Sequence, residues 1–244
     1  ASAASATRVP TLLELFGDRG YLLGDPSLRP ERAETFDLGV ALRGRAGPVR
    51  GRAELRGFAT LARDLIRYRR NSQYQAVPEN VDGTTVLAGG ELGVRGRATR
   101  HLELVGALTL LGTWAPFGPA DVPKRLPLRP WLTAYVRPTV RATDVGALDA
   151  LAVWFDVAHL AETFWDPANT SALPAQTRVG LGISLFAWDR RLRLDAAVRD
   201  LFDRRGGDLL GFPLPGRTVH VSLTVASAPA GPGDFAERTG SPQN

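Results

Sequence analysis

The chain has 244 residues, of which 44% are hydrophobic, and it contains no cysteine. This length and composition exclude a disordered chain, and the lack of cysteine excludes a disulfide framework, a cysteine zinc site and a thiol nucleophile. The formal net charge is +5, but the arginines are spread along the chain instead of forming one basic patch, so we expect no nucleic-acid partner. The chain begins at Ala1 without a start methionine, and we expect a piece of a longer protein.

Nine segments alternate apolar residues with polar or small ones, which is the primary signal of a β-strand. In the first segment Phe36, Leu38 and Val40 share one face, whereas Asp37 lies on the other. The longest uncharged run, residues 104–120, is shorter than the roughly 20 residues that a spanning helix needs. The nine segments lie near residues 35–43, 52–61, 85–95, 102–110, 132–137, 151–157, 178–185, 192–199 and 218–225.

The links between these segments alternate in length, as in a meander with tight turns at one end and long loops at the other. One face of the segments carries Arg, Asp, Glu and Thr, and the other carries almost no charge. This layout is typical of an outer-membrane barrel with a wet interior and a lipid-facing wall. The pattern therefore predicts an all-β fold, an antiparallel transmembrane β-barrel meander. The alternative is a soluble β-rich module, such as a propeller or sandwich, that binds a carbohydrate or a protein partner and purifies without detergent.

The two ends of the chain carry motifs that resemble those of TonB-dependent outer-membrane receptors. The family pattern has an R-x-P-[ST]-L-x-E-L run, then G-N-P-x-L-K-P-E, then a strand that reads E-x-G, and near its end v-x-N-L-F-D and P-G-R-x. Two ordered motifs at opposite ends, with a fitting number of strands between them, are more specific than either alone. The matching segments here are Arg8–Phe16, Gly24–Glu31, Glu34–Val40, Val198–Asp203 and Pro215–Thr218.

The resemblance implies a 22-stranded barrel filled by a plug domain, of which this chain would hold about nine strands. Residues 1–33 are then expected as an extracellular hallmark loop, with residues 1–7 able to end a preceding strand. Residues 34–226 are expected as the C-terminal barrel strands. Residues 227–244, rich in Pro and Gly, are expected as a disordered tail. Asp25 and Asp200 replace the usual asparagines, and the chain does not end on an aromatic residue.

The same resemblance implies a transport receptor of the bacterial outer membrane and not an enzyme. It would take up a scarce nutrient, such as a ferric siderophore, without covalent chemistry. The implied partners are membrane lipid, the plug domain, the remaining strands, periplasmic TonB and a small-molecule metal chelate. Receptors of this family that take up haem carry a His between the first two motifs. No His lies between Pro10 and Asp25 here, which disfavours haem.

No catalytic, cofactor-binding or metal-binding constellation is visible, and three histidines are far apart in the sequence. Seven residues in the expected outer loops are candidates for ligand contact, although solvated strand extensions and loop packing would look the same. These candidates are Arg67, Arg69, Arg70, Tyr74, Trp114, Phe117 and Trp165. Residues of the motifs are expected to shape loops and strand ends: Pro10, Glu14, Asp25, Pro26, Leu28, Pro30, Glu31, Gly39, Pro215, Gly216 and Arg217.

Overall fold

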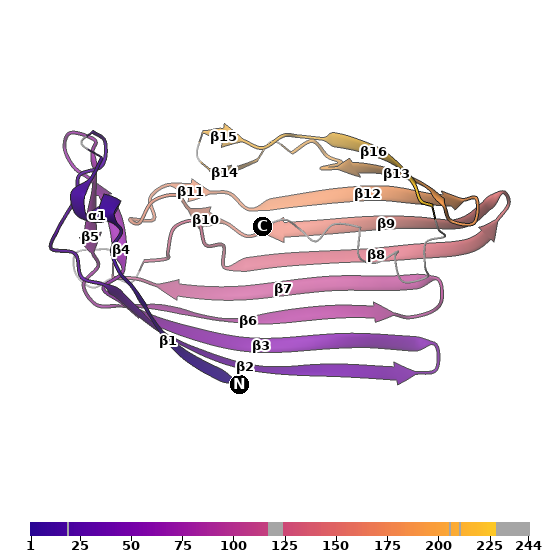
Figure 1. The fold of residues 1–244 in the computed structure, drawn as a ribbon, viewed down its shortest axis with the longest axis horizontal. Helices are drawn as coiled ribbons and strands as arrows, with labels where there is room; N and C mark the ends of the chain where they lie inside the picture. The colour runs from indigo at the N-terminus through magenta and orange to yellow at the C-terminus, as the bar shows by residue number, and fades with distance from the viewer. Residues whose placement is uncertain (19, 117–123, 205, 210, 228–244) are drawn as a thin grey trace.

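A computed structural model describes residues 1–18, 20–116, 124–204, 206–209 and 211–227. Its main element is one ten-stranded sheet in which every neighbouring pair is antiparallel (Figure 1). The predicted all-β antiparallel fold is confirmed. In their order across the sheet, the strands are β1 (Ser2–Arg8), β2 (Glu31–Ala46), β3 (Val49–Arg63), β6 (Thr84–Arg97), β7 (Leu102–Trp114), β8 (Leu132–Val145), β9 (Leu148–Leu160), β12 (Gln176–Ala187), β13 (Leu192–Arg199) and β16 (Thr218–Val225).

Nine of these strands are the nine segments predicted from alternation, and β1 is the tenth. Residues 1–33, expected as a loop whose first seven residues could end a preceding strand, contain β1 and the short helix α1 (Leu12–Phe16). β1 lacks large apolar residues, so alternation could not reveal it. It pairs with the first half of β2 from Ser2 opposite Asp37 to Arg8 opposite Glu31. Residues 228–244, most of the expected tail, lie outside the described part of the chain.

The links alternate in length as predicted. Tight turns join β2 to β3, β6 to β7, β8 to β9 and β12 to β13 at one end of the sheet, here called the short-turn end (Figure 1). Two of these turns place Gly47 and Gly146 at positive φ, which glycine adopts without strain. The long links leave from the opposite end, here called the long-link end.

Three of the long links contain small hairpins that alternation did not predict. They are β4 (Ile66–Arg70) with β5 (Ala76–Asn80), β10 (Thr163–Phe164) with β11 (Ala172–Leu173), and β14 (Gly207–Leu209) with β15 (Phe212–Pro213). Segments of two to five residues contain too few repeats for a period of two to stand out.

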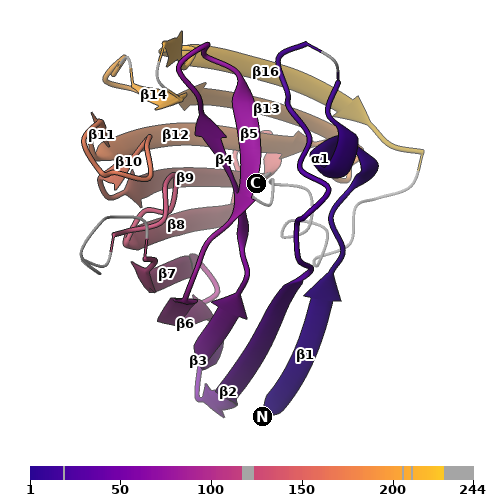
Figure 2. The ribbon, with the colours of Figure 1, turned by 90° about the vertical axis from the view of Figure 1, so that its left-hand side faces the viewer.

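The sheet curves into an open arc (Figure 2), and its two faces differ in chemistry. Large apolar residues stay exposed on one face, for example Leu38 at 70% and Val221 at 69%. Polar residues of the central strands, such as Glu103 and Ser184, are buried on the other face. Because side chains crowd together inside a curve, this burial places the polar face on the concave side. Among the described residues, no helix has the length and hydropathy needed to cross a membrane.

Candidate functional site

The long-link end of β1, β2 and β3 carries a polar structure made from two separate parts of the chain. We call it the hairpin unit and define it as residues 9–30 and 64–83. It contains α1 and the hairpin β4–β5, which stand together beside the end of the sheet (Figures 1 and 2). The unit includes most of the N-terminal motif and four of the seven ligand candidates.

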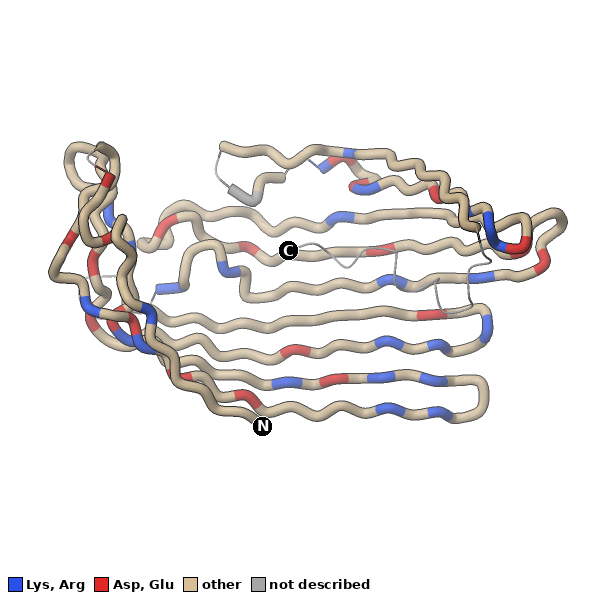
Figure 3. The backbone as a smooth tube through the Cα atoms, viewed as in Figure 1, with Lys and Arg blue, Asp and Glu red and all other residues tan. Residues whose placement is uncertain are grey.

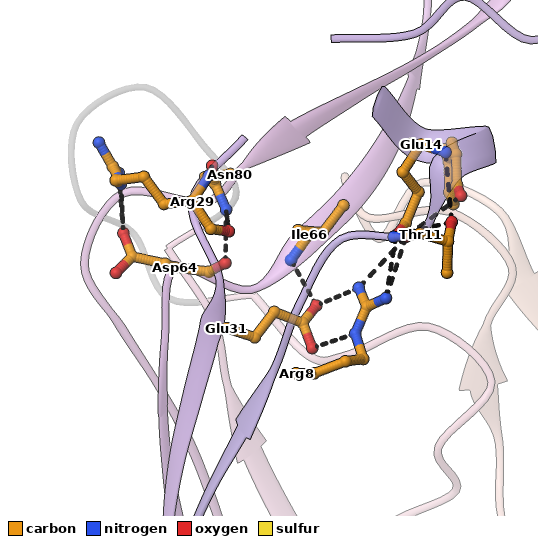
Figure 4. Close-up of polar contacts among 9 residues, drawn as sticks. Arg8, Thr11, Glu14, Arg29, Glu31, Asp64, Ile66 and Asn80 are labelled. Atoms are coloured by element: carbon orange, nitrogen blue, oxygen red, sulfur yellow. Dashed lines mark hydrogen bonds and ion pairs between the residues drawn. The ribbon is translucent and has the colours of Figure 1, made fainter. Parts of the chain in front are cut away.

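One arginine at the end of β1 fixes the base of the hairpin unit (Figure 4). Arg8 Nε lies 2.7 Å from Glu31 Oε2, and Arg8 Nη2 lies 2.8 Å from Glu31 Oε1. Its Nη1 also lies 3.0 Å from Glu14 Oε2. The backbone N–H of Ile66 donates to Glu31 Oε1 at 2.7 Å. Arg8 and Glu31 therefore connect both barrel strands to α1 and to the start of β4.

The local sequence explains why α1 forms. Thr11 is the N-cap, and its hydroxyl accepts from the Glu14 N–H at 3.2 Å, while Glu14 Oε2 accepts from the Thr11 N–H at 2.7 Å. This reciprocal pair is a capping box. The helix ends at Gly17, whose φ is +71°, and Gly24 packs so closely on the backbone of Phe16 that a Cβ there would overlap it.

Glu14 is buried, with 5% of its surface exposed. Burial alone would raise its pKa, but hydrogen bonds from Arg8 and Thr11 outweigh burial and lower the pKa to about 2. The hydroxyl of Tyr68 on β4 lies 3.3 Å from Glu14 Oε1. Burial, followed by the nearby Glu14 charge, raises the pKa of Tyr68. Glu14 is thus held as a carboxylate at the centre of the unit.

The loop after α1 is attached to β5 by backbone hydrogen bonds. The N–H of Leu23 donates to the carbonyl of Ala76 at 2.9 Å, and the N–H of Ala76 donates to the carbonyl of Tyr21 at 2.9 Å. Gln75 Nε2 adds a hydrogen bond to the carbonyl of Gly20 at 3.1 Å. The hairpin and the N-terminal loop therefore form one connected structure.

A second polar cluster lies where the chain leaves β3 and enters the hairpin unit (Figure 4). The guanidinium of Arg29 lies 2.8 Å from Asp64 Oδ1. Asn80 accepts from the Arg29 N–H at 2.8 Å and donates to the carbonyl of Asp64 at 2.7 Å. The ion pair with Asp64, and to a smaller extent that with Asp82, raises the pKa of Arg29.

The candidate arginines of β4 divide between the two faces of the hairpin. Arg67 and Arg69 both pair with Glu79 on β5, at 2.6 Å and 2.9 Å. Burial would raise the pKa of Glu79, but these two arginines outweigh it and lower the pKa. Arg70 is exposed and makes no ion pair with any described residue. Tyr74, in the turn of the hairpin, is 76% exposed and has a φ of +61°.

The aromatic candidates lie on other links. Trp114 ends β7 on the apolar face, 49% exposed, with its ring over Gly112. Trp165 lies between β10 and β11, where its N–H donates to the carbonyl of Ser171 at 2.8 Å. Phe117 lies outside the described residues. The described contacts do not join Trp114 or Trp165 to the candidate arginines.

The other motif residues lie in turns or close backbone contacts. Asp25 Oδ1 accepts from the N–H and hydroxyl of Ser27, and Leu28 is buried. A Cβ at Gly39 would lie 3.1 Å from the carbonyl oxygen of Leu55 on β3. Pro10, Pro26 and Pro30 lie in the irregular segments around α1, and Pro215 lies in the segment before β16.

The C-terminal motif is organised around one carboxylate. Asp203 Oδ1 accepts from the N–H of Arg217 at 2.8 Å, and Gly216 packs against the same carboxylate so closely that a Cβ would overlap it. This contact holds the segment just before β16.

Several residues in or at the base of the unit were not among the sequence candidates, notably Arg8, Tyr68, Asp64 and Asn80. Arg8 is part of the motif, so its position was visible in the sequence although its partners were not. Asp64 and Asn80 meet Arg29 from more than 30 residues away, and no local pattern indicates such contacts. The described residues contain no group of three or more His, Asp or Glu that could hold a metal ion.

Comparisons with known proteins identify a family and a fold for this chain. The family model described as "TonB dependent receptor-like, beta-barrel" matches residues 1–201. The copper transporter OprC shares 20% identity and a TM-score of 0.69, over 91% of this chain and 36% of its own. The ferric yersiniabactin uptake receptor FyuA from Yersinia pestis shares 17% identity and a TM-score of 0.66, over 91% and 34%.

The siderophore receptor PiuA from Acinetobacter baumannii shares 18% identity and a TM-score of 0.65, over 91% of this chain and 33% of its own. The chain thus spans about a third of the length of these solved proteins. At such identity the likeness shows a shared fold. No curated protein matches the chain in sequence.

Proposed function

The chain belongs to the TonB-dependent receptor family, whose members are outer-membrane β-barrels, and we propose that its parent protein imports a scarce metal as an anionic chelate, such as a ferric siderophore. In this proposal the chain forms one wall of the barrel and part of its outer surface. The remaining strands and a plug domain come from the rest of the parent protein, and periplasmic TonB supplies the energy.

The observation that carries this proposal is that the sheet matches a bacterial barrel in two independent ways. Its two faces differ in polarity, and its two ends differ in the length of their links. An apolar convex face suits lipid, and a polar concave face suits a wet interior. All long links leave from one end and all tight turns from the other (Figure 1). Bacterial barrels have long loops outside the cell and short turns in the periplasm. This orientation puts the hairpin unit outside.

Two features support a negatively charged chelate as the ligand. Arg70 and Tyr74 are exposed near the turn of the hairpin unit, and arginine suits carboxylate and phenolate oxygens. Among proteins of the same fold, one is titled a copper transporter and two are titled receptors for siderophores or ferric yersiniabactin. These titles define a range of metals and chelates to test.

The proposal is tested by uptake into cells. The parent receptor is produced in a Gram-negative host that lacks its own siderophore receptors, and accumulation of radioactive iron is measured with catecholate, hydroxamate and carboxylate siderophores. We expect uptake with one class, and loss of that uptake when TonB is deleted. Uptake that continues without TonB would contradict active transport. Uptake of a copper chelate but of no iron chelate would replace iron by copper as the cargo.

A further inference from the structure

Two arginines of the sheet lie on its apolar convex face. Charged residues occur at many points along the strands (Figure 3), but alternation places nearly all of the strand arginines on the concave side. Within the ten described strands, only Arg32 on β2 and Arg63 on β3 share the face of exposed apolar residues such as Phe36. Both are exposed and lie at the long-link end of their strands. A charge on a lipid-facing wall costs free energy, so this exception calls for a physical reason.

The register places these two arginines directly opposite each other. Like charges in this position destabilise a sheet. Neither Arg32 nor Arg63 forms an ion pair with a described residue. Glu34 lies one row nearer the short-turn end, opposite Leu61, and is exposed on the same face. This single nearby carboxylate leaves the pair with a net positive charge, which a further anion would balance.

Two hydroxyl groups extend the pair into a row of hydrogen-bond donors. Thr7 on β1 lies opposite Arg32, and Thr84 on β6 lies opposite Arg63. Both threonines are exposed. Neighbouring strands lie about 4.8 Å apart, so the four residues span about 14 Å across the sheet. Two guanidiniums on adjacent strands can both donate to the oxygens of one phosphate, which arginine binds in a bidentate manner.

The neighbouring rows place the arginine pair at the outer edge of the apolar band. Trp114 ends β7 on the convex face, in the same row as Glu34, and tryptophan is enriched where a membrane meets water. The arginines lie one row further toward the long-link end, about 6.7 Å along the strand. On the opposite side of that tryptophan row, Phe36 and Leu38 are 51% and 70% exposed. A ligand at the pair can therefore extend acyl chains along an apolar surface.

We propose that Arg32 and Arg63 together bind the phosphate of a phosphorylated lipid in the outer leaflet, and that Thr7 and Thr84 donate to the same head group. This inference rests on the proposed function only in taking the convex face as lipid-facing and the long-link end as external. A phosphate attached to acyl chains matches both the arginine pair and the apolar rows beside it. The site lies on the outer wall of the barrel, so it is separate from the contact proposed for the transported chelate.

Lipid binding by the purified parent receptor tests the proposal. Native mass spectrometry in detergent follows the binding of added lipid A, which carries phosphate on an acylated sugar, and a titration gives the Kd. The double variant Arg32→Gln, Arg63→Gln should weaken this binding by about tenfold, because charge-assisted hydrogen bonds to phosphate are lost. The matched control, Arg43→Gln with Arg45→Gln, removes the same charge from the concave face of β2 and should bind normally. Equal Kd values for the two double variants would overturn the proposal.

Changes to the ligand and to Glu34 test the chemistry of the contact. Dephosphorylated lipid A keeps its acyl chains and should bind the unmodified receptor about tenfold more weakly than lipid A, because it lacks the group that the arginines bind. Glu34→Gln removes the nearby negative charge and should strengthen binding of lipid A. Equal binding of the two forms of lipid A would show that only acyl chains are recognised, and would refute a phosphate site. Displacement of lipid A by an equal concentration of inorganic phosphate, at constant ionic strength, would assign the pair to a free anion instead.

Two controls keep these outcomes distinct. Heat-modifiable migration on gels reports whether each variant is a folded barrel. If the double variant does not fold, the single variants Arg32→Gln and Arg63→Gln decide, since each should weaken binding of lipid A. The measurement needs neither a chelate nor TonB, so failure of lipid A binding is separable from failure of metal uptake.

Discussion

Arg8 and Glu31 face each other across β1 and β2 and form two parallel hydrogen bonds, at 2.7 and 2.8 Å. The same guanidinium reaches Glu14 on α1, so one side chain links the sheet to the hairpin unit. Motif residues that are 6 and 23 positions from Arg8 in sequence thereby meet in one place. The motif at the start of the chain therefore forms the base of the hairpin unit.

Replacing Arg8 by Gln should loosen the hairpin unit while leaving the sheet intact. Glu14 would remain buried without its charged partner, and such a loss costs about 1–3 kcal/mol. Hydrogen exchange should then speed up at the amides of Glu14 and Ile66. Arg70→Gln, in the same unit but without an ion pair in the described structure, is the control and should leave both amides protected. Unchanged protection in Arg8→Gln would contradict the assigned role.

The hairpin unit should lose stability in acid because of Glu14. Its pKa is about 2 when folded, against 4.5 as the ordinary value. Since the folded pKa is the lower one, the stabilisation is fully present above pH 4.5 and is lost as the pH falls toward 2. Carbon-13 NMR of labelled glutamate, assigned with Glu14→Gln, should show this low titration. In Arg8→Gln the pKa should rise, since burial is then opposed by fewer hydrogen bonds; a pKa near 4.5 in the unmodified protein would contradict the geometry.

Arg70→Gln should weaken binding of the ferric chelate that supports uptake by about tenfold, which is about 1.4 kcal/mol. The reason is that Arg70 is an exposed cation on the hairpin whose charge is not neutralised by any described carboxylate. Tryptophan fluorescence quenching of the purified parent receptor gives the Kd. Arg100→Gln, in a tight turn at the opposite end of the sheet, is the matched control and should bind normally. Equal affinity of Arg70→Gln and the control would remove Arg70 from the ligand site.

Two neighbouring substitutions in β16 should differ in effect according to face. Val221 is 69% exposed on the convex face, whereas His220 lies on the concave face opposite Ala197. Val221→Arg should destabilise the barrel by about 2–4 kcal/mol if it lies near the bilayer midplane, because it puts a charge in lipid. His220→Arg should cost much less. Unfolding in urea from lipid vesicles measures both, and equal costs would argue against lipid on the convex face.

The period-two pattern was sufficient to predict nine strands, their two faces and the alternation of links. In β16, for example, Val219, Val221 and Leu223 alternate with polar residues. Each strand repeats this alternation several times, so it can be recognised from the strand's own sequence. The pattern did not predict β1, where alanines replace large side chains, or the three small hairpins in the long links. β1 pairs with a strand that begins more than 20 residues away, and the hairpin strands of two to five residues contain too few repeats for a period of two to stand out.

The candidate site was less predictable than the fold. The motif indicated that Glu14 and Glu31 matter for structure, but not that both share Arg8. The cluster of arginines in β4 was visible in the sequence. The sequence did not show that Glu79 pairs with Arg67 and Arg69, because Glu79 lies across a hairpin turn from them. Ion pairs between strands depend on register, which the sequence of one strand does not specify.

Cysteine labelling in intact cells tests most directly whether this chain is an outer-membrane barrel wall with its long links outside. The chain has no cysteine of its own, so single probes are read without background from it. Ser72→Cys, in the exposed turn of the hairpin unit, should react with a membrane-impermeant maleimide on whole cells. Pro48→Cys, in the tight turn between β2 and β3, should react only after the outer membrane is permeabilised. Labelling of Pro48→Cys on intact cells with protection of Ser72→Cys would reverse the orientation, and equal labelling of both would contradict a membrane barrel.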